Sequence, residues 1–263
     1  MLGGVFITFL SYSSMFHITS LTTFVYLMLA IFMLREVKPA SIKEKLGLRD
    51  IGMIVKDTPF FIYCIIAIFM QIPYQQMYTL LSVYSSSYVG LDKFWIGMLY
   101  AESGLMVVLF QYWISRKIRS LRMTHALAFC ALVFAFGFGM LGVFSFLALP
   151  FMCIAIVTLA EMIWAPAGST LQANLSPEAR RGRYFGFSSL CVSTGIAMGP
   201  YFGGVLKDSF SNNVQDIWYV IMGMFLLCCI LYLALGKILP ERANTMETGK
   251  REPETVKKIK KVA

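Results

Sequence analysis

Two carboxylates stand inside otherwise apolar stretches and are the strongest candidates for chemistry in this sequence. Glu102 lies in the apolar run 94–114, and Glu161 lies in the run 147–171, close to Trp164. Along a helix, the two acids would lie roughly 12 and 15 Å from one end of their runs. A carboxylate at that depth in a membrane is costly unless it faces a bundle interior or an aqueous cavity. The two acids therefore predict a proton-coupling or cation-binding site; the alternative is a structural acid that hydrogen-bonds between helices.

A row of polar side chains precedes these acids in the run 60–84. Gln71, Gln75, Tyr78 and Ser82 follow one another at spacings of four, three and four residues, which places them on one face of a helix. Pro73 interrupts that helix and leaves a backbone carbonyl without its usual donor. A polar face turned toward lipid would be unfavourable. We expect this face to line a substrate cavity or to join neighbouring helices by hydrogen bonds.

Small residues mark one face of a later run. Gly195, Gly199 and Gly203 recur every four residues around Pro200, and Gly204 follows directly. Glycines at this spacing allow two helices to approach closely, and a proline bends the helix that contains it. The pattern predicts close helix packing, with a hinge for conformational change as the further possibility.

Signatures of enzymes and metal sites do not appear in the sequence. Only two histidines are present, His17 and His125, and there is no HExxH motif, Gly-rich phosphate loop or Cys/His cluster. The cysteines all lie inside apolar runs, as expected of small buried residues rather than of disulfides or metal ligands (Cys64, Cys130, Cys153, Cys191, Cys228 and Cys229). We therefore expect no enzymatic activity, no metal and no cofactor.

The elements that must position these residues are long apolar runs. There are seven, each 19 to 25 residues long and free of Lys and Arg, at 16–34, 60–84, 94–114, 124–144, 147–171, 185–206 and 217–235. About 20 apolar residues are needed for a helix to cross the hydrocarbon core. With 58% hydrophobic residues, the sequence predicts an all-α integral membrane protein with seven transmembrane helices.

Positive charge gathers on one side of these predicted spans. Alternate connections and the C-terminal tail carry six, four, three and eight Lys and Arg residues, which is 21 of the 23, while the remaining connections carry one, none and one. Basic loops face the cytoplasm, so we expect a multi-pass protein of the cell membrane with a cytoplasmic C-terminus. The net charge of +9 then indicates a membrane surface rather than nucleic acid as the partner. The predicted cytoplasmic basic loops include Arg116, Lys117, Arg119, Arg180 and Arg181.

A short motif is repeated at a separation of 200 residues. Gly3, Gly4 and Val5 correspond to Gly203-Gly204-Val205, and each motif is followed by a polar stretch, a span and a basic exit. Such an echo in a multispan protein is typical of two homologous halves, as found in some transporters.

Three stretches resemble the C-terminal half of major facilitator superfamily transporters. The sequence SPEARRGRYFGF, with the GIAMGPYFGGVL that follows, covers 176–206 and resembles a loop and the eleventh helix of that family. TLAEMIWAP at 158–166 resembles a tenth helix of its drug:proton antiporter branch. SRKIRSLR at 115–122 resembles the basic loop between helices eight and nine, but Ser115 replaces the usual Asp and Gln111 the usual Gly.

This resemblance implies half of a two-bundle fold, together with the helix that precedes it. Residues 1–34 would be a remnant of the N-terminal bundle, containing the tail of one helix and one full span. Residues 35–58 would be a cytoplasmic linker, 59–236 the C-terminal six-helix bundle, and 237–263 a basic cytoplasmic tail without regular structure after Pro240. The missing N-terminal bundle, or a second copy of this chain, would be the partner.

The function implied is secondary active transport of small molecules, with proton-coupled efflux of amphipathic compounds as the leading hypothesis. The substrate and proton would be handled by Glu161, Glu102, Gln71, Gln75, Tyr78 and Trp164. We expect the chain to be truncated and inactive alone. Uptake of a sugar or metabolite is an alternative, and a seven-span receptor or membrane scaffold fits the span count equally well.

Overall fold

The computed structural model describes residues 12–33, 48–118, 121–144 and 146–245, and within them every regular element is a helix. Seven helical stretches are long and apolar enough to cross a membrane, which confirms the predicted all-α membrane class. Helices suit this composition because each satisfies its own backbone hydrogen bonds in lipid. The helices are α2 (Tyr12–Met33), α3 (Leu48–Lys56), α4 (Thr58–Tyr74), α5 (Leu80–Ser87), α6 (Lys93–Ile118), α7 (Met123–Val143), α8 (Leu149–Leu175), α9 (Arg181–Ser209) and α10 (Asp216–Ile238), with the short 3-10 helices η1 (Gln75–Met77), η2 (Glu178–Arg180) and η3 (Glu241–Asn244).

The second predicted span is a broken helix. It covers Thr58–Ser87 but consists of α4, then η1, then α5. Pro73 lies near the end of α4 and has no N–H to donate, so the chain tightens into a 3-10 turn after Tyr74. The polar row predicted on this span therefore passes through the break.

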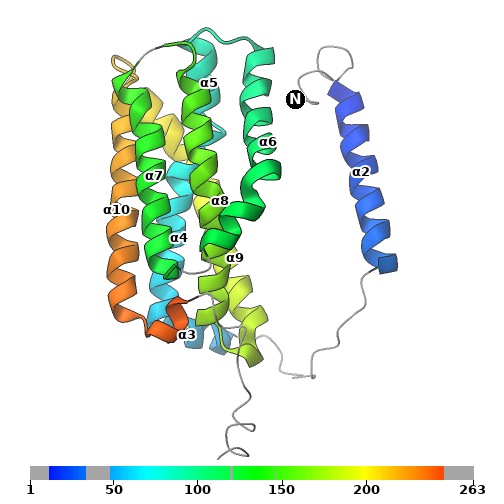
Figure 1. Ribbon diagram of the computed structural model, residues 1–263, viewed down its shortest axis with the longest axis vertical. Coiled ribbons are helices and arrows are strands. Elements are labelled where there is room, and N and C mark those ends of the chain that lie inside the picture. Colours follow the sequence, from blue (N-terminus) through cyan, green and yellow to red (C-terminus); the bar gives the residue numbers. More distant parts are fainter. Residues whose placement is uncertain (1–11, 34–47, 119–120, 145, 246–263) are drawn as a thin grey trace, which may run out of the picture.

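The spanning stretches other than α2 form a bundle (Figure 1). The largest contacts join α10 to α7, α7 to α8, α4 to α9, α6 to α8 and α10 to α4. Aromatic rings fill the contact between α7 and α10: Phe134 stacks on Phe225 at 5.1 Å, and Phe138 stacks on Phe225 at 5.6 Å and on Trp218 at 6.0 Å. These rings are buried and belong to the hydrophobic core of the bundle.

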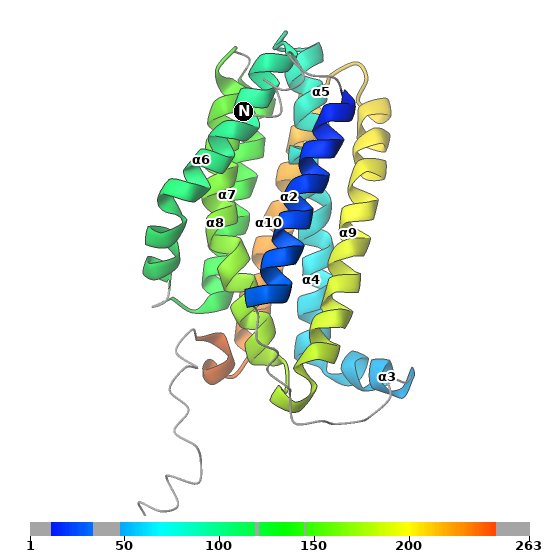
Figure 2. The same cartoon turned by 90° about the vertical axis from the view of Figure 1, so that its right-hand side faces the viewer.

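Two spanning helices are largely uncovered. In α6 only 6% of the spanning window is buried, and its main neighbour is α8. In α2 none of the window is buried, and the helix stands apart from the bundle in Figure 1 and crosses in front of it in the turned view of Figure 2. Val108 of α6 is 80% exposed and Trp113 is 67% exposed. Apolar faces of this size are covered by lipid or by further protein in a membrane.

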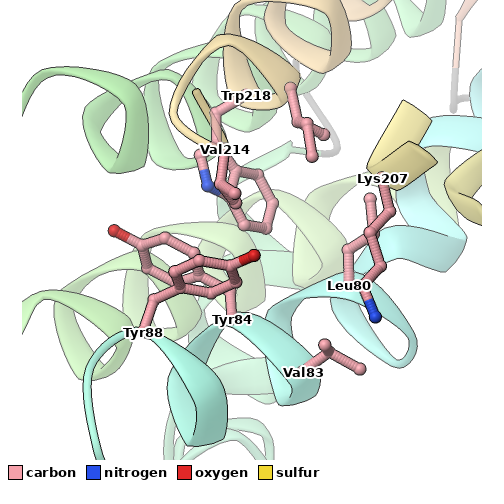
Figure 3. A pocket seen from close by; sticks show the side chains of 8 residues that line it. Leu80, Val83, Tyr84, Tyr88, Lys207, Val214 and Trp218 are labelled. Carbon is pink, nitrogen blue, oxygen red and sulfur yellow. The ribbon is translucent and has the colours of Figure 1, made fainter. Parts of the chain in front are cut away.

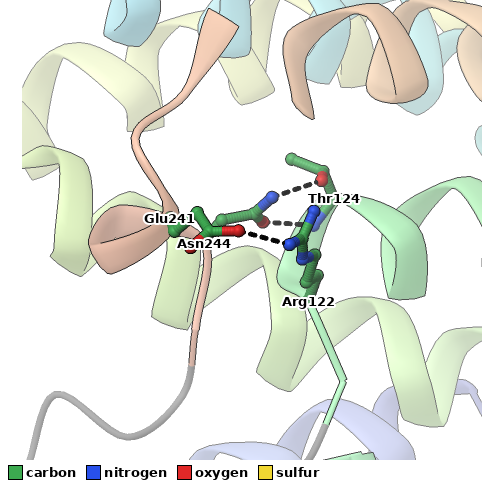
Figure 4. Close-up of polar contacts among 4 residues, drawn as sticks. All are labelled: Arg122, Thr124, Glu241 and Asn244. Atoms are coloured by element: carbon green, nitrogen blue, oxygen red, sulfur yellow. Dashed lines mark hydrogen bonds and ion pairs between the residues drawn. The ribbon is translucent and has the colours of Figure 1, made fainter. Parts of the chain in front are cut away.

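The tail begins with an ordered segment, which corrects the expectation that regular structure ends at Pro240. The 3-10 helix η3 contacts α8 near its C-terminal end, and it lies beside the first turn of α7 (Figure 4). Asn244 accepts a 2.8 Å hydrogen bond from the backbone N–H of Thr124 and donates to Thr124 Oγ1 at 2.8 Å. Arg122 pairs with Glu241 beside this contact. Asn244 therefore caps the first turn of α7 from the far end of the sequence.

Several sequence predictions fall on residues outside the described ranges. These are the motif at 3–5, most of the linker (35–47), Arg119 and the tail from 246 onward. Within the described part of the linker, residues 48–56 form the helix α3.

Candidate functional site

Glu161 lies beside an aromatic cluster where α4, α7 and α8 meet. The Tyr74 ring lies 5.1 Å from the Trp164 ring and 5.7 Å from the Phe134 ring, and Phe134 lies 6.2 Å from Trp164. Glu161 is half-buried and precedes Trp164 by about one turn of α8. The Tyr74 hydroxyl is close enough to the Glu161 carboxyl to interact with it electrostatically. A carboxyl group, a phenol and an indole thus meet in an apolar setting.

Tyrosine hydroxyls continue from Tyr74 across the helix break to α6. The hydroxyls of Tyr74 and Tyr78 are 3.4 Å apart, and the ring of Tyr78 stacks on that of Tyr100 at 6.0 Å. Tyr100 donates to the Met77 carbonyl at 2.9 Å and lies 2.6 Å from Ser82 Oγ. Two members of the predicted polar row, Tyr78 and Ser82, therefore connect α4 and α5 to α6.

Glu102 occupies a different position, on the sparsely covered helix α6. Glu102 as a whole is half-buried, whereas its Oε2 atom is buried with no hydrogen-bond partner among the described residues. The next residue, Ser103, accepts a 2.9 Å hydrogen bond from Thr158, which lies about one turn before Glu161 on α8. The two acids thus flank the same contact between α6 and α8. A buried, unpartnered carboxylate oxygen can take a proton or a cation.

The glutamine row and the glycine row lie against each other at the contact between α4 and α9. A Cβ added at Gly195 would lie 2.7 Å from Gln71 Cβ, and one at Gly199 would lie 2.5 Å from Gln75 Cβ. Gln71 is buried there, whereas Gln75 keeps partial exposure. Gln71 and Gln75 therefore pack against the glycine face of α9, and whether they line a cavity stays a prediction.

Gly203 and Gly204, the remaining glycines of the motif, differ in whether another helix lies against them. A Cβ at Gly203 would collide with the side chain of Gln76, so this glycine also permits the close approach of α4 and α9. A Cβ at Gly204 would meet nothing within 4 Å, and Pro200 is exposed. No described residue lies against Gly204, so its role in packing or as a hinge stays a prediction.

Gln76 is a buried polar residue that sequence reasoning missed. Its Nε2 donates to the carbonyls of Ile72 at 3.0 Å and Gly199 at 2.9 Å, and its Oε1 accepts from Thr79 Oγ1 at 2.9 Å. It is fully buried. The available signal was its place three residues after Pro73, because a helix break leaves backbone groups that a nearby side chain must satisfy.

Gln111 was noted only as a departure from a family pattern, and it has a specific contact. Its Nε2 donates to the Met162 carbonyl at 3.1 Å and to Ser115 Oγ at 2.9 Å. Met162 is four residues before Pro166, which has no N–H, so its carbonyl lacks the usual helix donor. Gln111 supplies the donor from α6, in the turn of α8 that carries Glu161 and Trp164.

The basic residues predicted to be cytoplasmic lie at one end of the bundle. Arg116 and Lys117 are in the last turn of α6, and Arg180 and Arg181 are at the start of α9 (Figure 2). All four are exposed. No group of three or more His, Cys, Asp or Glu side chains able to hold a metal occurs within the residues that the structure describes.

Opposite this end is a small pocket between α5, the end of α9 and the start of α10 (Figure 3). Tyr84, Tyr88 and Trp218 supply aromatic walls, and Lys207 lines the same pocket. The Tyr84 ring meets the Trp218 ring edge-on at 5.3 Å. No predicted site residue lines this pocket.

Comparison with known proteins agrees with the resemblance drawn from the sequence. Residues 151–262 match the family model described as Major Facilitator Superfamily. An uncharacterized MFS-type transporter, YttB, of Bacillus subtilis is 26% identical over 216 residues, 80% of this chain and 53% of that protein. A Na(+), Li(+), K(+)/H(+) antiporter of Planococcus maritimus is 26% identical over 58% of this chain and 39% of its own length. The multidrug resistance protein MdtH of Shigella boydii is 31% identical over 44% of this chain and 28% of its own length.

The chain spans about half the length of the first of these relatives, and less of the others. The match is to a family of transporters, which supports transport over the receptor and enzyme alternatives.

Proposed function

We propose that this chain forms one helical bundle of a secondary transporter of the major facilitator superfamily, which exports small amphipathic compounds in exchange for protons. The observation that carries the proposal is Glu161, whose half-buried carboxyl lies beside Tyr74 and one turn from Trp164. Isolated acids within membrane spans commonly serve proton relays and ion pathways.

The chemistry of this cluster suits a molecule with a cationic and an apolar part. An ionised Glu161 attracts the cation, and the faces of Trp164 and Tyr74 add cation–π attraction. A protonated Glu161 loses that attraction. Binding of the proton and binding of the substrate would therefore exclude each other, which is the linkage that exchange requires.

The surrounding side chains limit the substrate further. Gln75 and Tyr78 retain exposure beside the cluster and are proposed to line the cavity, with Gln71 behind them against α9. The seven apolar runs contain no Lys or Arg, so this bundle has few groups to neutralise a phosphate or dicarboxylate. A small substrate without high negative charge fits best.

A second bundle is part of the proposal. The helix α6, which carries Glu102, packs mainly against α8 and leaves most of its surface uncovered. A midplane site between two bundles would cover this surface, and one bundle rocking against the other would give alternating access. The chain alone is then inactive. Saturable, proton-driven flux in liposomes holding this chain as a monomer would contradict that view.

The test of the coupling site is Glu161→Gln in the complete transporter. Glutamine keeps the size and hydrogen bonding of the side chain but cannot titrate. We expect dye or drug efflux to lose its dependence on the proton gradient, while Glu161→Asp retains part of it. A matched control is Glu178→Gln, at an exposed position outside the bundle interior. Proton-dependent efflux that survives Glu161→Gln would refute the proposal.

Exchange of a monovalent metal cation for protons is a second candidate. It is favoured by Glu102, whose Oε2 is buried without a partner, and by the similarity to the Planococcus antiporter. In everted vesicles, Na⁺ or Li⁺ would then discharge a proton gradient, and Glu102→Gln would abolish this response. Efflux of organic cations without a response to Na⁺ or Li⁺ favours the first candidate, and transport of neutral sugars alone would favour uptake of a metabolite.

A further inference from the structure

The short helix α3 carries apolar side chains that the bundle does not cover. Ile51, Ile54 and Val55 have the spacing of one helical face. Ile54 is 4% exposed, because it packs where α3 contacts α4 and α9. Ile51 is 47% exposed and Val55 is 41% exposed. One edge of this apolar face is therefore buried in the protein, and the rest is open.

The position of α3 places that open face at the edge of the bilayer. α3 ends at Lys56, and the membrane-spanning stretch begins at Thr58. The junction is held to the bundle, since the Tyr184 hydroxyl donates to the Asp57 carboxylate at 3.0 Å. The helix turns aside at the base of α4 and α9 rather than extending α4 (Figure 2). Its exposed side chains thus stay within a short distance of the membrane boundary.

Positive side chains surround the open face. Lys56 at the end of α3 is exposed, as are Arg180 and Arg181 where α9 begins. Arg180 reaches α3 directly, with Nη1 3.3 Å from the Met53 sulfur. The acid at this junction, Asp57, is engaged by Tyr184. An apolar edge flanked by cations is the pattern of a helix that lies on an anionic lipid surface.

We propose that α3 docks on the membrane surface. Ile51 and Val55 enter the boundary between headgroups and acyl chains, and Lys56, Arg180 and Arg181 bind the phosphates of anionic lipids. The docked helix sets the height of the start of α4 relative to the bilayer. This inference uses the membrane location of the spans and does not depend on the substrate or on which side of the membrane α3 occupies.

Site-specific photocrosslinking of the full chain in lipid nanodiscs tests this docking. A photoreactive aliphatic amino acid replaces Ile51 in one variant and Gly52 in the other, since a Cβ at Gly52 meets nothing within 4 Å. The two positions are neighbours in sequence but about 100° apart around the helix. We expect lipid adducts, detected by mass spectrometry, to be several-fold more abundant at Ile51. Equal yields at both positions, or no lipid at Ile51, would overturn the proposal.

The role of charge is tested in the same nanodiscs, prepared with and without phosphatidylglycerol. Adducts at Ile51 should favour phosphatidylglycerol, and Arg181→Gln should reduce that preference roughly fivefold if one charge is removed from the surface. Lys93→Gln, an exposed change at the other end of the bundle, is the control and should have no effect. If neither Arg181→Gln nor Arg180→Gln changes the preference of the Ile51 adducts for phosphatidylglycerol, the proposal that these arginines bind anionic lipid is wrong.

Discussion

Gln111 of α6 donates a 3.1 Å hydrogen bond to the carbonyl of Met162, the carbonyl that Pro166 leaves without its usual donor in α8. The bond joins two helices and stabilises a weakened turn of α8 at once. That turn also carries Glu161 and Trp164. Gln111 of α6 thus helps to fix the shape of α8, the helix that carries Glu161.

We predict that Gln111→Leu destabilises the protein by about 0.5–2 kcal/mol, the range for interhelical hydrogen bonds in membranes and for an acceptor left unpaired. Unfolding of the purified protein in detergent or mixed micelles measures this. Ser115→Ala removes the other partner of Gln111 and leaves the Met162 bond in place, so it should cost less. An equal loss in both variants would show that the Met162 contact has no special role.

A second prediction concerns the contact between α4 and α9. Gly199→Ala puts a methyl group 2.5 Å from Gln75 Cβ, so the two helices must separate or Gln75 must move. We expect a loss of about 1–3 kcal/mol, as for other overpacked sites. Gly204→Ala is the matched control five residues away, and it should be neutral because its added Cβ meets nothing. Equal stability of the two variants would contradict the close approach at Gly199.

The cap that Asn244 provides for α7 gives a third prediction. Asn244→Ala removes both hydrogen bonds to Thr124 and should cost about 1–2 kcal/mol, the usual effect of losing a helix cap. Asn244→Asp keeps an acceptor for the Thr124 N–H and adds a negative charge at a helix N-terminus, which is favourable. Hydrogen exchange at the first turn of α7 should therefore accelerate in the alanine variant and much less in the aspartate variant. Unchanged protection in Asn244→Ala would mean that the segment after Pro240 does not hold α7.

Orientation in the membrane can be tested by labelling single introduced cysteines. Ser87 lies at the end of α5 and Arg181 at the opposite end of the bundle, and both are exposed. Because basic loops face the cytoplasm, a membrane-impermeant maleimide should label Ser87→Cys in intact cells and Arg181→Cys only after permeabilisation. The parent protein supplies the background, since its cysteines are buried apart from the half-buried Cys191. Labelling of Arg181→Cys in intact cells would reverse the predicted topology.

The spans and the likeness to a transporter family could be predicted from the sequence, whereas most contacts around the site could not. Long apolar runs dictate helices locally, since lipid offers no other partner for the backbone. The polar and glycine rows were both visible as periodic faces, yet periodicity does not say which face meets which. The structure brings Gln71 and Gln75 of one row against Gly195 and Gly199 of the other.

What the sequence determined by itself is the all-helical membrane class, the approximate limits of seven spans and the likeness to a transporter family, because each depends on composition or on short motifs. What only the tertiary structure decided are the contacts between distant segments. Gln76 reaches Gly199, Gln111 reaches Met162 and Asn244 reaches Thr124. In each case a side-chain amide forms a hydrogen bond with a backbone group of another helix: Gln76 and Gln111 donate, and Asn244 accepts. That partner is fixed by helix packing in space, which no local pattern of residues encodes.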